Sequence, residues 1–289
     1  MRGFLLMLLL SFAADYRSEI EKWRAAEEAS LRSPAGWLTV VGLEWLQEGD
    51  NRISMPEGAP DFGVFTLRGG KVSLRSPGAG PVELRSDATG RPAIIDRGSY
   101  SVSIIERGKR IGVRIRDKSS PARREFRGMK WFPIAENYRI TARWEAYAQP
   151  RSIPIVNILG DASREKSTGR AWFTLQGVEC SLEPVDQGGK LFFIFRDQTS
   201  GKETYGAGRF LYADPPKGGS VMLDFNKAVN PPCAFISFAT CPLPPPQNSL
   251  RVRIQAGEMA PADSSMKSGA RSVRDIHRRS TGESSPVRN

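Results

Sequence analysis

From residue 63 to residue 256 the chain repeats one pattern: short runs in which apolar and polar positions alternate, separated by Gly, Pro and Asp. A period of two places successive side chains on opposite faces of a strand. Short strands with turn residues between them are typical of β-sandwiches and barrels. We therefore predict a mainly β protein with sandwich- or barrel-like antiparallel sheets, with strands at 64–68, 72–75, 100–107, 110–117, 138–147, 153–158, 171–175, 191–197, 210–212, 221–225, 235–238 and 250–256.

A different pattern precedes the strands. Apolar residues at positions 16, 20, 23, 26 and 31 recur near helical spacing with charged residues between them. This spacing predicts one N-terminal amphipathic helix over 16–32. Asp15 is placed to cap this helix, and the Ser33-Pro34 pair ends it.

The first 14 residues have the organisation of a short secretory signal peptide. Arg2 supplies a positive charge, residues 3–12 are apolar, and the segment ends in Ser-Phe-Ala-Ala at 11–14. A buried helix is the alternative interpretation of this segment. A transmembrane helix is not, because ten apolar residues are too few to span a bilayer. We expect a signal peptide at 1–14 and an exported protein, periplasmic or extracellular, with no transmembrane segment after its removal.

The composition changes after residue 258. The last 31 residues hold seven serines, no aromatic residue and no leucine, with six Lys or Arg against three acids. Such a segment cannot bury enough apolar surface to offset the entropy of ordering it. We predict a disordered basic tail at 259–289 and, because no repeat or long linker precedes it, a single domain at 15–258.

The net charge and the histidine content limit the kinds of catalytic, metal and binding site that the folded domain can hold. The net charge is +11, of which the tail carries +3, so residues 1–258 keep +8. The single histidine, His277, lies in the tail. Ser-His-Asp triads, Cys-His dyads and HExxH zinc sites are therefore excluded from the folded domain. No reading motif for nucleic acid appears, and we expect no specific nucleic-acid partner.

Three cysteines offer one pairing. Cys233 and Cys241 stand eight residues apart in a proline-rich stretch, whereas alternation around Cys180 predicts a buried core residue. A disulfide between Cys233 and Cys241 is one interpretation, and two buried thiols are the other. Three dispersed cysteines cannot supply a soft four-ligand shell, so we expect no metal site and assign no cofactor.

Two stretches carry candidate functional residues. In 110–117, alternation turns Ile111, Val113 and Ile115 to one face and three arginines to the other, where guanidiniums could bind carboxylate or phosphate. The segment 223–248 holds six prolines between 231 and 246, and its Asp224, Asn226 and Asn230 could cap turns or line a cleft.

The residues of these stretches resemble the bacterial domain of unknown function 1684 family. The resemblance is carried by Asp-Phe-Asn at 224–226, Asn-Pro-Pro-Cys-Ala-Phe at 230–235 and Cys-Pro-Leu-Pro-Pro at 241–245, and extends to Gly-Trp-Leu at 36–38, residues 42–46, 114–117 and 126–131, and Asp197, Thr199, Tyr205 and Gly208-Arg209. Members usually carry tyrosine where this chain has Val229. The resemblance implies one fold from about residue 16 to residue 258, and it assigns no activity.

The polar residues of these blocks are the candidate site: Arg114, Arg116, Asp117, Asp197, Tyr205, Arg209, Asp224, Asn226 and Asn230. Our first hypothesis is a binding module for a small anionic ligand or a glycan, with arginines holding the anion and a tryptophan such as Trp37, Trp45 or Trp131 as an apolar wall. The alternative is a histidine-independent hydrolase with paired carboxylates and arginine support. A third interpretation gives the polar clusters a purely structural role. The oligomeric state is not assigned.

Overall fold

The computed structural model describes residues 2–261, with side chains from residue 15 onward. The predictions for 262–289, including those for His277 and most of the tail, lie outside the described residues. Within the described part, contacts divide the chain into two compact units. The first unit comprises residues 2–29, 128–234 and 241–261, and the second comprises 30–127 and 235–240.

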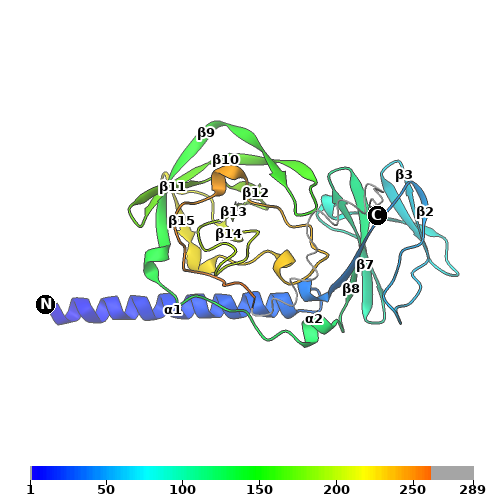
Figure 1. Cartoon of the computed structure of the whole chain (residues 1–289), viewed down its shortest axis with the longest axis horizontal. Coiled ribbons are helices and arrows are strands. Elements are labelled where there is room, and N and C mark those ends of the chain that lie inside the picture. Colours follow the sequence, from blue (N-terminus) through cyan, green and yellow to red (C-terminus); the bar gives the residue numbers. More distant parts are fainter. Residues whose placement is uncertain (1, 262–289) are drawn as a thin grey trace, which may run out of the picture. The chain divides into compact units, whose positions relative to one another are not determined.

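The first unit is built on two antiparallel sheets (Figure 1). One has the order β11-β10-β9-β15, from β9 (Arg139–Val156), β10 (Ala162–Leu175), β11 (Val178–Leu182) and β15 (Ser220–Asp224). The other has the order β12-β13-β14, from β12 (Val185–Gln187), β13 (Lys190–Phe195) and β14 (Arg209–Ala213). Their apolar faces share one core, in which Phe225 contacts Phe173 and Phe195 with ring centroids 5.7 and 5.5 Å apart.

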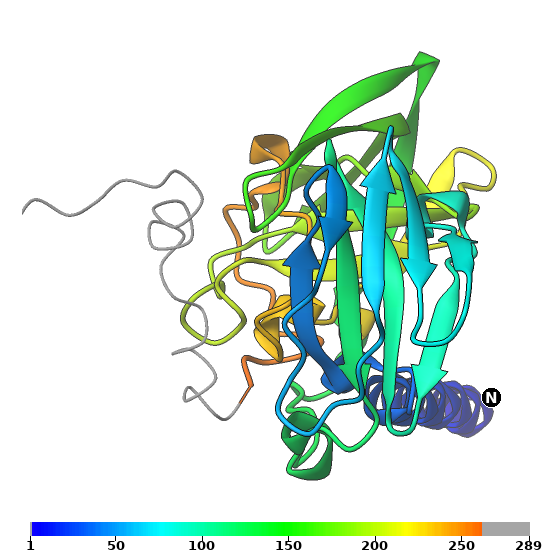
Figure 2. The ribbon, with the colours of Figure 1, turned by 90° about the vertical axis from the view of Figure 1, so that its right-hand side faces the viewer.

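The second unit also holds two antiparallel sheets, and Figure 2 shows its strands side by side. The order β1-β8-β7-β6 joins β1 (Val40–Trp45), β6 (Ile94–Arg97), β7 (Tyr100–Arg107) and β8 (Arg110–Asp117). The order β2-β3-β4-β5 joins β2 (Gly49–Asn51), β3 (Val64–Arg68), β4 (Lys71–Arg75) and β5 (Pro81–Leu84). Phe65, Ile104 and Val113 belong to its core.

The mainly β, antiparallel fold class and the N-terminal helix are confirmed. Helix α1 spans Arg2–Arg32 and ends directly before Ser33, as predicted, but it begins well before residue 16. The earlier start follows from the Leu, Met, Phe and Ala of 3–14, which are compatible with a helix and include no proline. A second, short helix, α2, spans Pro121–Arg124. In the described part of the chain, α1 included, no helix combines the length and the apolar character needed to cross a membrane.

Two predicted strands are wrong. Residues 235–238 follow a 3₁₀ turn at Pro232–Ala234 and form no ladder, because the chain keeps turning at 235, 237 and 238. Residues 250–256 form no ladder either, and residues 251 and 252 lie in a bend. Their backbone groups are used singly: the Leu250 amide donates to Arg196, and the carbonyls of Ile254 and Ala256 accept from a buried arginine.

The division into two units does not decide the prediction of one domain at 15–258. Each unit has its own core, yet the chain crosses between them four times within the described residues. A single domain at 15–258 therefore stays a prediction.

Candidate functional site

The most buried candidate pair is Arg209 and Asp197, in the first unit. Arg209 begins β14, Asp197 follows β13, and both side chains are inaccessible to solvent. The guanidinium donates to Asp197 Oδ2 at 2.7 Å and to the carbonyls of Ile254, at 3.0 Å, and Ala256. Burial lowers the pKa of Arg209, and the Asp197 carboxylate acts in the opposite direction.

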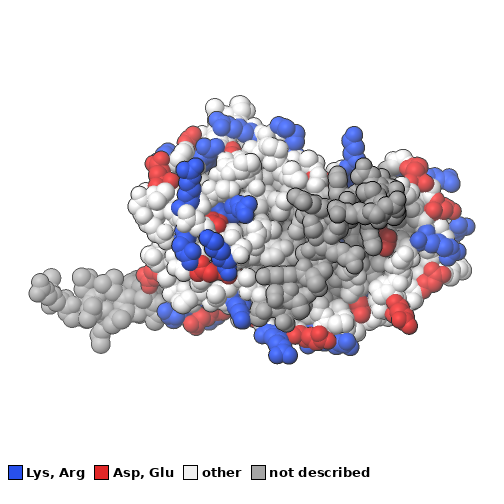
Figure 3. Space-filling view, viewed as in Figure 1, with Lys and Arg blue, Asp and Glu red and all other residues white. Residues whose placement is uncertain are grey.

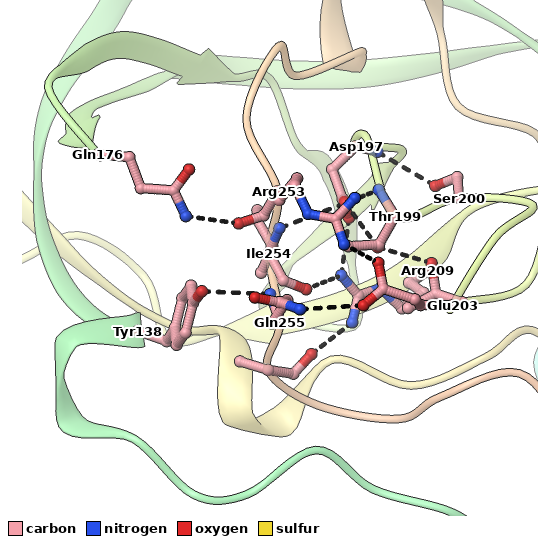
Figure 4. A network of polar contacts seen from close by, with 12 residues as sticks. Tyr138, Gln176, Asp197, Thr199, Ser200, Glu203, Arg209, Arg253, Ile254 and Gln255 are labelled. Carbon is pink, nitrogen blue, oxygen red and sulfur yellow. Dashed lines mark hydrogen bonds and ion pairs between the residues drawn. The ribbon is translucent and has the colours of Figure 1, made fainter.

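The second oxygen of Asp197 is also occupied. Asp197 Oδ1 accepts from the amide and the hydroxyl of Thr199 at 2.7 and 2.6 Å, and from the Ile254 amide at 3.3 Å. Figure 4 shows the neighbouring contacts, in which the Glu203 carboxylate accepts hydrogen bonds from the side chains of Arg253 and Gln255. The ion pair thus holds the ladder-free segment 250–256 against the sheet, and neither partner has an oxygen or N–H turned to solvent for a ligand.

Asp224 and Asn226 form a second buried group, at the end of β15. The Tyr16 hydroxyl donates to Asp224 Oδ1 at 2.9 Å and accepts from Asn226 Nδ2 at 3.0 Å. Asn226 also exchanges two hydrogen bonds with the backbone of Ala135, at 2.9 and 3.0 Å. Burial, followed by the Asp224 charge, raises the pKa of Tyr16. These contacts fasten α1 to the first unit through a neutral phenol.

A shallow pocket of about 400 Å³ lies beside Tyr16. Its lining comes from the helix and from the first residue of β9: Asp15, Tyr16, Ser18, Glu19, Lys22 and Arg139. The Arg139 guanidinium covers the Tyr16 ring at 4.8 Å from its centroid. Two acids and two bases balance in this lining, so the pocket offers no net field for an anion.

Asn230 contacts Glu258, a residue that the candidate list omits. The Asn230 amide donates to Glu258 Oε2 at 2.7 Å, and its Nδ2 donates to the carbonyl of Met259 at 2.8 Å. Glu258 is 1% exposed, and burial raises its pKa to about 8. No sequence signal marks this carboxyl as buried.

Tyr205 anchors the segment that carries Cys233. Its hydroxyl donates to the Cys233 carbonyl at 3.0 Å, and burial raises the pKa of the phenol. All three cysteines of the chain lie in the described part and are thiols in the structure. Cys180 is buried, as predicted. The oxidation of Cys233 and Cys241 stays a prediction.

The remaining three candidates belong to the second unit. Arg114 and Arg116 lie on one face of β8, opposite Val113 and Ile115, as alternation predicts. Their guanidinium carbons are 4.8 and 5.7 Å from the centroid of the Trp37 ring. Arg114 is buried, and Arg116 donates to the carbonyls of Ala35 and Gly36. Asp117 caps the turn after β8 by accepting from the Ser119 amide at 2.8 Å.

The structure therefore brings some candidates together and keeps others apart. Arg209 meets Asp197, Asp224 meets Asn226, and the two arginines of β8 share Trp37. The Arg209–Asp197 pair, the Asp224–Asn226 pair and Arg116 make their hydrogen bonds with the protein's own side chains and carbonyls, which is the arrangement that the structural interpretation expects. The described residues also hold no group of three or more Cys, His, Asp or Glu side chains placed to bind a metal ion.

A more open polar surface lies on the side of β9 and β10 that faces away from the first core. Ala142, Ala171 and Phe173 belong to that core, and the alternating residues between them point outward. We call this surface the aromatic–arginine face; it consists of Arg143, Glu145, Tyr147, Arg151, Arg170 and Trp172. Lys and Arg side chains are spread over the region where Figure 1 labels β9, β11 and β15 (Figure 3).

Cross-strand pairing builds this face. Trp172 is opposite Arg143, and Arg170 is opposite Glu145. The guanidinium carbons of Arg143 and Arg170 are 5.9 and 5.6 Å from the Trp172 ring centroid, and Trp172 Nε1 donates to Glu145 at 2.6 Å.

At the distal end, Arg151 covers the Tyr147 ring at 3.8 Å, and the Tyr147 hydroxyl donates to Glu183 at 2.6 Å. Burial, with Glu183, raises the pKa of Tyr147 to about 12. This face is not among the sites predicted from the sequence, although the alternation of Arg170 and Trp172 with buried Ala171 and Phe173 indicates it.

Comparison with known proteins gives a family match over part of the chain and no activity. Residues 124–259 match the family model described as "protein of unknown function", DUF1684. No curated protein matches the chain. An uncharacterized protein of Haloarcula marismortui, solved by solution NMR, is 30% identical over 48% of this chain and 80% of its own, with a TM-score of 0.41.

The match covers the Asp-Phe-Asn and Asn-Pro-Pro-Cys-Ala-Phe blocks at 224–226 and 230–235, whereas the blocks at 36–46 and 114–117 lie outside it. The blocks within 124–259 are those on which the resemblance chiefly depends, and over these residues the chain is similar to the DUF1684 family.

Proposed function

We propose that this protein is a binding module for acidic glycans, which lie along the aromatic–arginine face. The observation that carries the proposal is the row of guanidiniums placed beside two aromatic rings on an outward-facing strand pair. Arg143 and Arg151 are exposed, and Trp172 and Tyr147 are partly exposed. Among the anionic ligands and glycans predicted from the sequence, acidic glycans are the class that would contact both the guanidiniums and the aromatic rings.

Each group on this face suits a part of an acidic sugar. Guanidiniums bind carboxylates and sulfates through paired, charge-assisted hydrogen bonds. The exposed parts of the Trp172 and Tyr147 rings offer apolar surface to the C–H faces of sugar rings. Glu145, which accepts from Trp172, holds the indole in place. A two-stranded ribbon is open along its length, so it suits an extended chain.

The paired-carboxylate hydrolase lacks comparable support. Asp197 is enclosed by Arg209 and Thr199, and Asp224 by Tyr16 and Asn226. Asp117 caps a turn in the other unit. A glycoside hydrolase needs two carboxyl groups across an open cleft, with room for the sugar between them.

Affinity electrophoresis of the purified protein in gels containing polygalacturonate, with neutral dextran gels as reference, tests the proposal. We expect polygalacturonate to retard the protein and dextran to leave it unaffected. Arg143→Gln should weaken binding about tenfold, the loss of one charge-assisted contact. Lys71→Gln removes the same charge from the exposed end of β4 and serves as the matched control.

Three outcomes would contradict the proposal. They are no retardation by polygalacturonate, an equal loss of binding in the Arg143 and Lys71 variants, and preferential retardation by single-stranded oligothymidylate. The third would indicate a nucleic-acid platform, on which bases stack on aromatic rings.

A further inference from the structure

Cys233 and Cys241 are held against each other within the first unit. The Cys233 backbone amide donates to Cys241 Sγ at 3.2 Å. Cys233 lies in the 3₁₀ turn Pro232–Ala234, and its carbonyl accepts the Tyr205 hydroxyl. Two prolines before Cys233 and one after Cys241 restrict the backbone at both positions. The contact is therefore a fixed feature of the fold.

The two thiols differ in reactivity. Cys233 is partly exposed and Cys241 is buried. Hydrogen bonds from the Cys241 thiol and the Tyr205 hydroxyl lower the pKa of Cys233 against the effect of its burial. Burial instead raises the pKa of Cys180. Thiolate character and access together select the attacking cysteine, so Cys233 has the features of the nucleophile and Cys241 those of the resolving thiol.

Six of the seven residues between the two cysteines belong to the other unit. Residues 235–240 are part of the second unit, whereas both cysteines are part of the first. Within the second unit the Phe235 ring meets Phe126 at 6.1 Å, and Arg107 Nε donates to Thr240 Oγ1 at 2.8 Å. A covalent bond between the cysteines would close this packed segment into a ring at its base.

We propose that Cys233 and Cys241 are a reversible dithiol–disulfide pair that locks the segment 235–240 as a closed loop when a disulfide oxidant is present. The Cys233 thiolate attacks one sulfur of the oxidant, such as oxidised glutathione, and releases one glutathione thiolate. Cys241 then gives up its proton and attacks Cys233 Sγ, releasing the second. The pair loses two protons and two electrons, and the electrons reduce the oxidant's disulfide.

The test equilibrates the full-length protein in glutathione buffers of increasing oxidised fraction, followed by acid quenching, alkylation and nonreducing peptide mass analysis. We expect two free thiols to disappear together and the protein mass to fall by that of two hydrogen atoms. One disulfide-linked peptide should contain both Cys233 and Cys241. Cys180 should remain alkylated throughout, and a reducing buffer should reverse the change.

Three variants separate the roles. Cys180→Ser should oxidise as the parent does. Cys241→Ser should stop at a mixed disulfide between Cys233 and glutathione. Tyr205→Phe should change the alkylation rate of Cys233 and leave that of Cys180 unaltered, because it removes the hydrogen bond that holds the Cys233 carbonyl. Equal alkylation rates of Cys233 and Cys180 in the parent would overturn the assignment of Cys233 as nucleophile.

Proteolysis tests the loop itself. Phe238 is 38% exposed, and chymotrypsin cleaves after phenylalanine. We expect oxidation to slow cleavage at this residue and to keep the two fragments joined until a reductant is added. Three thiols persisting in fully oxidised glutathione, or a bond to Cys180 or to a second chain, would overturn the proposal.

Discussion

At the scale of single residues, Glu258 has the most pronounced pH-dependent energetics. Its carboxyl is buried, and its pKa of about 8 lies well above the usual 4.5. The folded state therefore binds a proton that the unfolded chain has lost between these two pH values. Because the unfolded state binds fewer protons there, the free energy of unfolding falls as pH rises through this window.

We expect Glu258 to lower the stability by up to about 1.4 kcal/mol per pH unit between pH 5 and pH 8. Glu258→Gln keeps an acceptor for the Asn230 amide and cannot ionise. Urea unfolding at a series of pH values should show a flatter profile for this variant than for the parent. Parallel profiles would contradict the assignment.

Arg209 and Asp197 illustrate a different kind of residue-level coupling, in which each charge is tolerable only because the other is present. Arg209→Met leaves a buried carboxylate unpaired and should cost about 3 to 5 kcal/mol. Asp197→Asn should cost much less stability in the Arg209→Met variant than in the parent protein, because the double variant has no unpaired buried charge. Urea denaturation of the four proteins gives the coupling, and additive losses would argue against it.

At the scale of elements, the junction between α1 and β15 depends on one phenol hydroxyl. Tyr16→Phe removes a donor to Asp224 and an acceptor for Asn226. We expect a loss of about 1 to 3 kcal/mol in thermal or urea unfolding. Tyr212→Phe deletes the same atom where it makes one exposed contact of 3.4 Å, and it should be nearly neutral. Equal effects of the two changes would rule out the buried junction as the cause.

The elements also show what could be predicted from the sequence. Strands β7 and β8 have the predicted bounds because their alternation is regular and Gly108 marks the turn with a φ of 58°. Strand β9 joins the two predicted strands 138–147 and 153–158, because the chain stays in the sheet through Pro150, which lies between them.

Local sequence patterns also fail to predict pairing over long distances along the chain, both in β10 and in the candidate site. The first half of β10 was missed because residues 163–168 are polar, and their pairing comes from β9 rather than from an apolar face. Buried pairs such as Tyr16 with Asp224 join positions 208 residues apart, which local periodicity cannot reveal. The polar residues of the family-like blocks were therefore identified without their partners.

At the scale of the whole molecule, the first unit extends slightly past the predicted end of the domain. Asn230 donates to the Met259 carbonyl, the Met259 amide to Lys130, and the Ala260 amide to Glu203. We expect a chain of residues 1–258 to lose about 1 kcal/mol for each of these hydrogen bonds. A chain of residues 1–261 should match the full-length protein in thermal unfolding. Equal stability of both truncated chains would contradict the contribution of Met259 and Ala260.

The single-domain prediction is tested at the same scale. Each unit is assembled from separate stretches of the chain, so neither can be excised as one segment. We expect one cooperative transition in calorimetry, with equal calorimetric and van't Hoff enthalpies. Two resolved transitions would instead show that the units unfold separately.

The distance along the chain between Tyr16 and Asp224 also sets an order of events during synthesis. A ribosome adds about 5 to 20 residues per second, so α1 emerges roughly 10 to 40 seconds before its partner on β15 exists. Throughout that interval the helix has no Asp224 or Asn226 to bind. The helix therefore makes its first contacts elsewhere, and it takes its place in the first unit only after β15 has been synthesised.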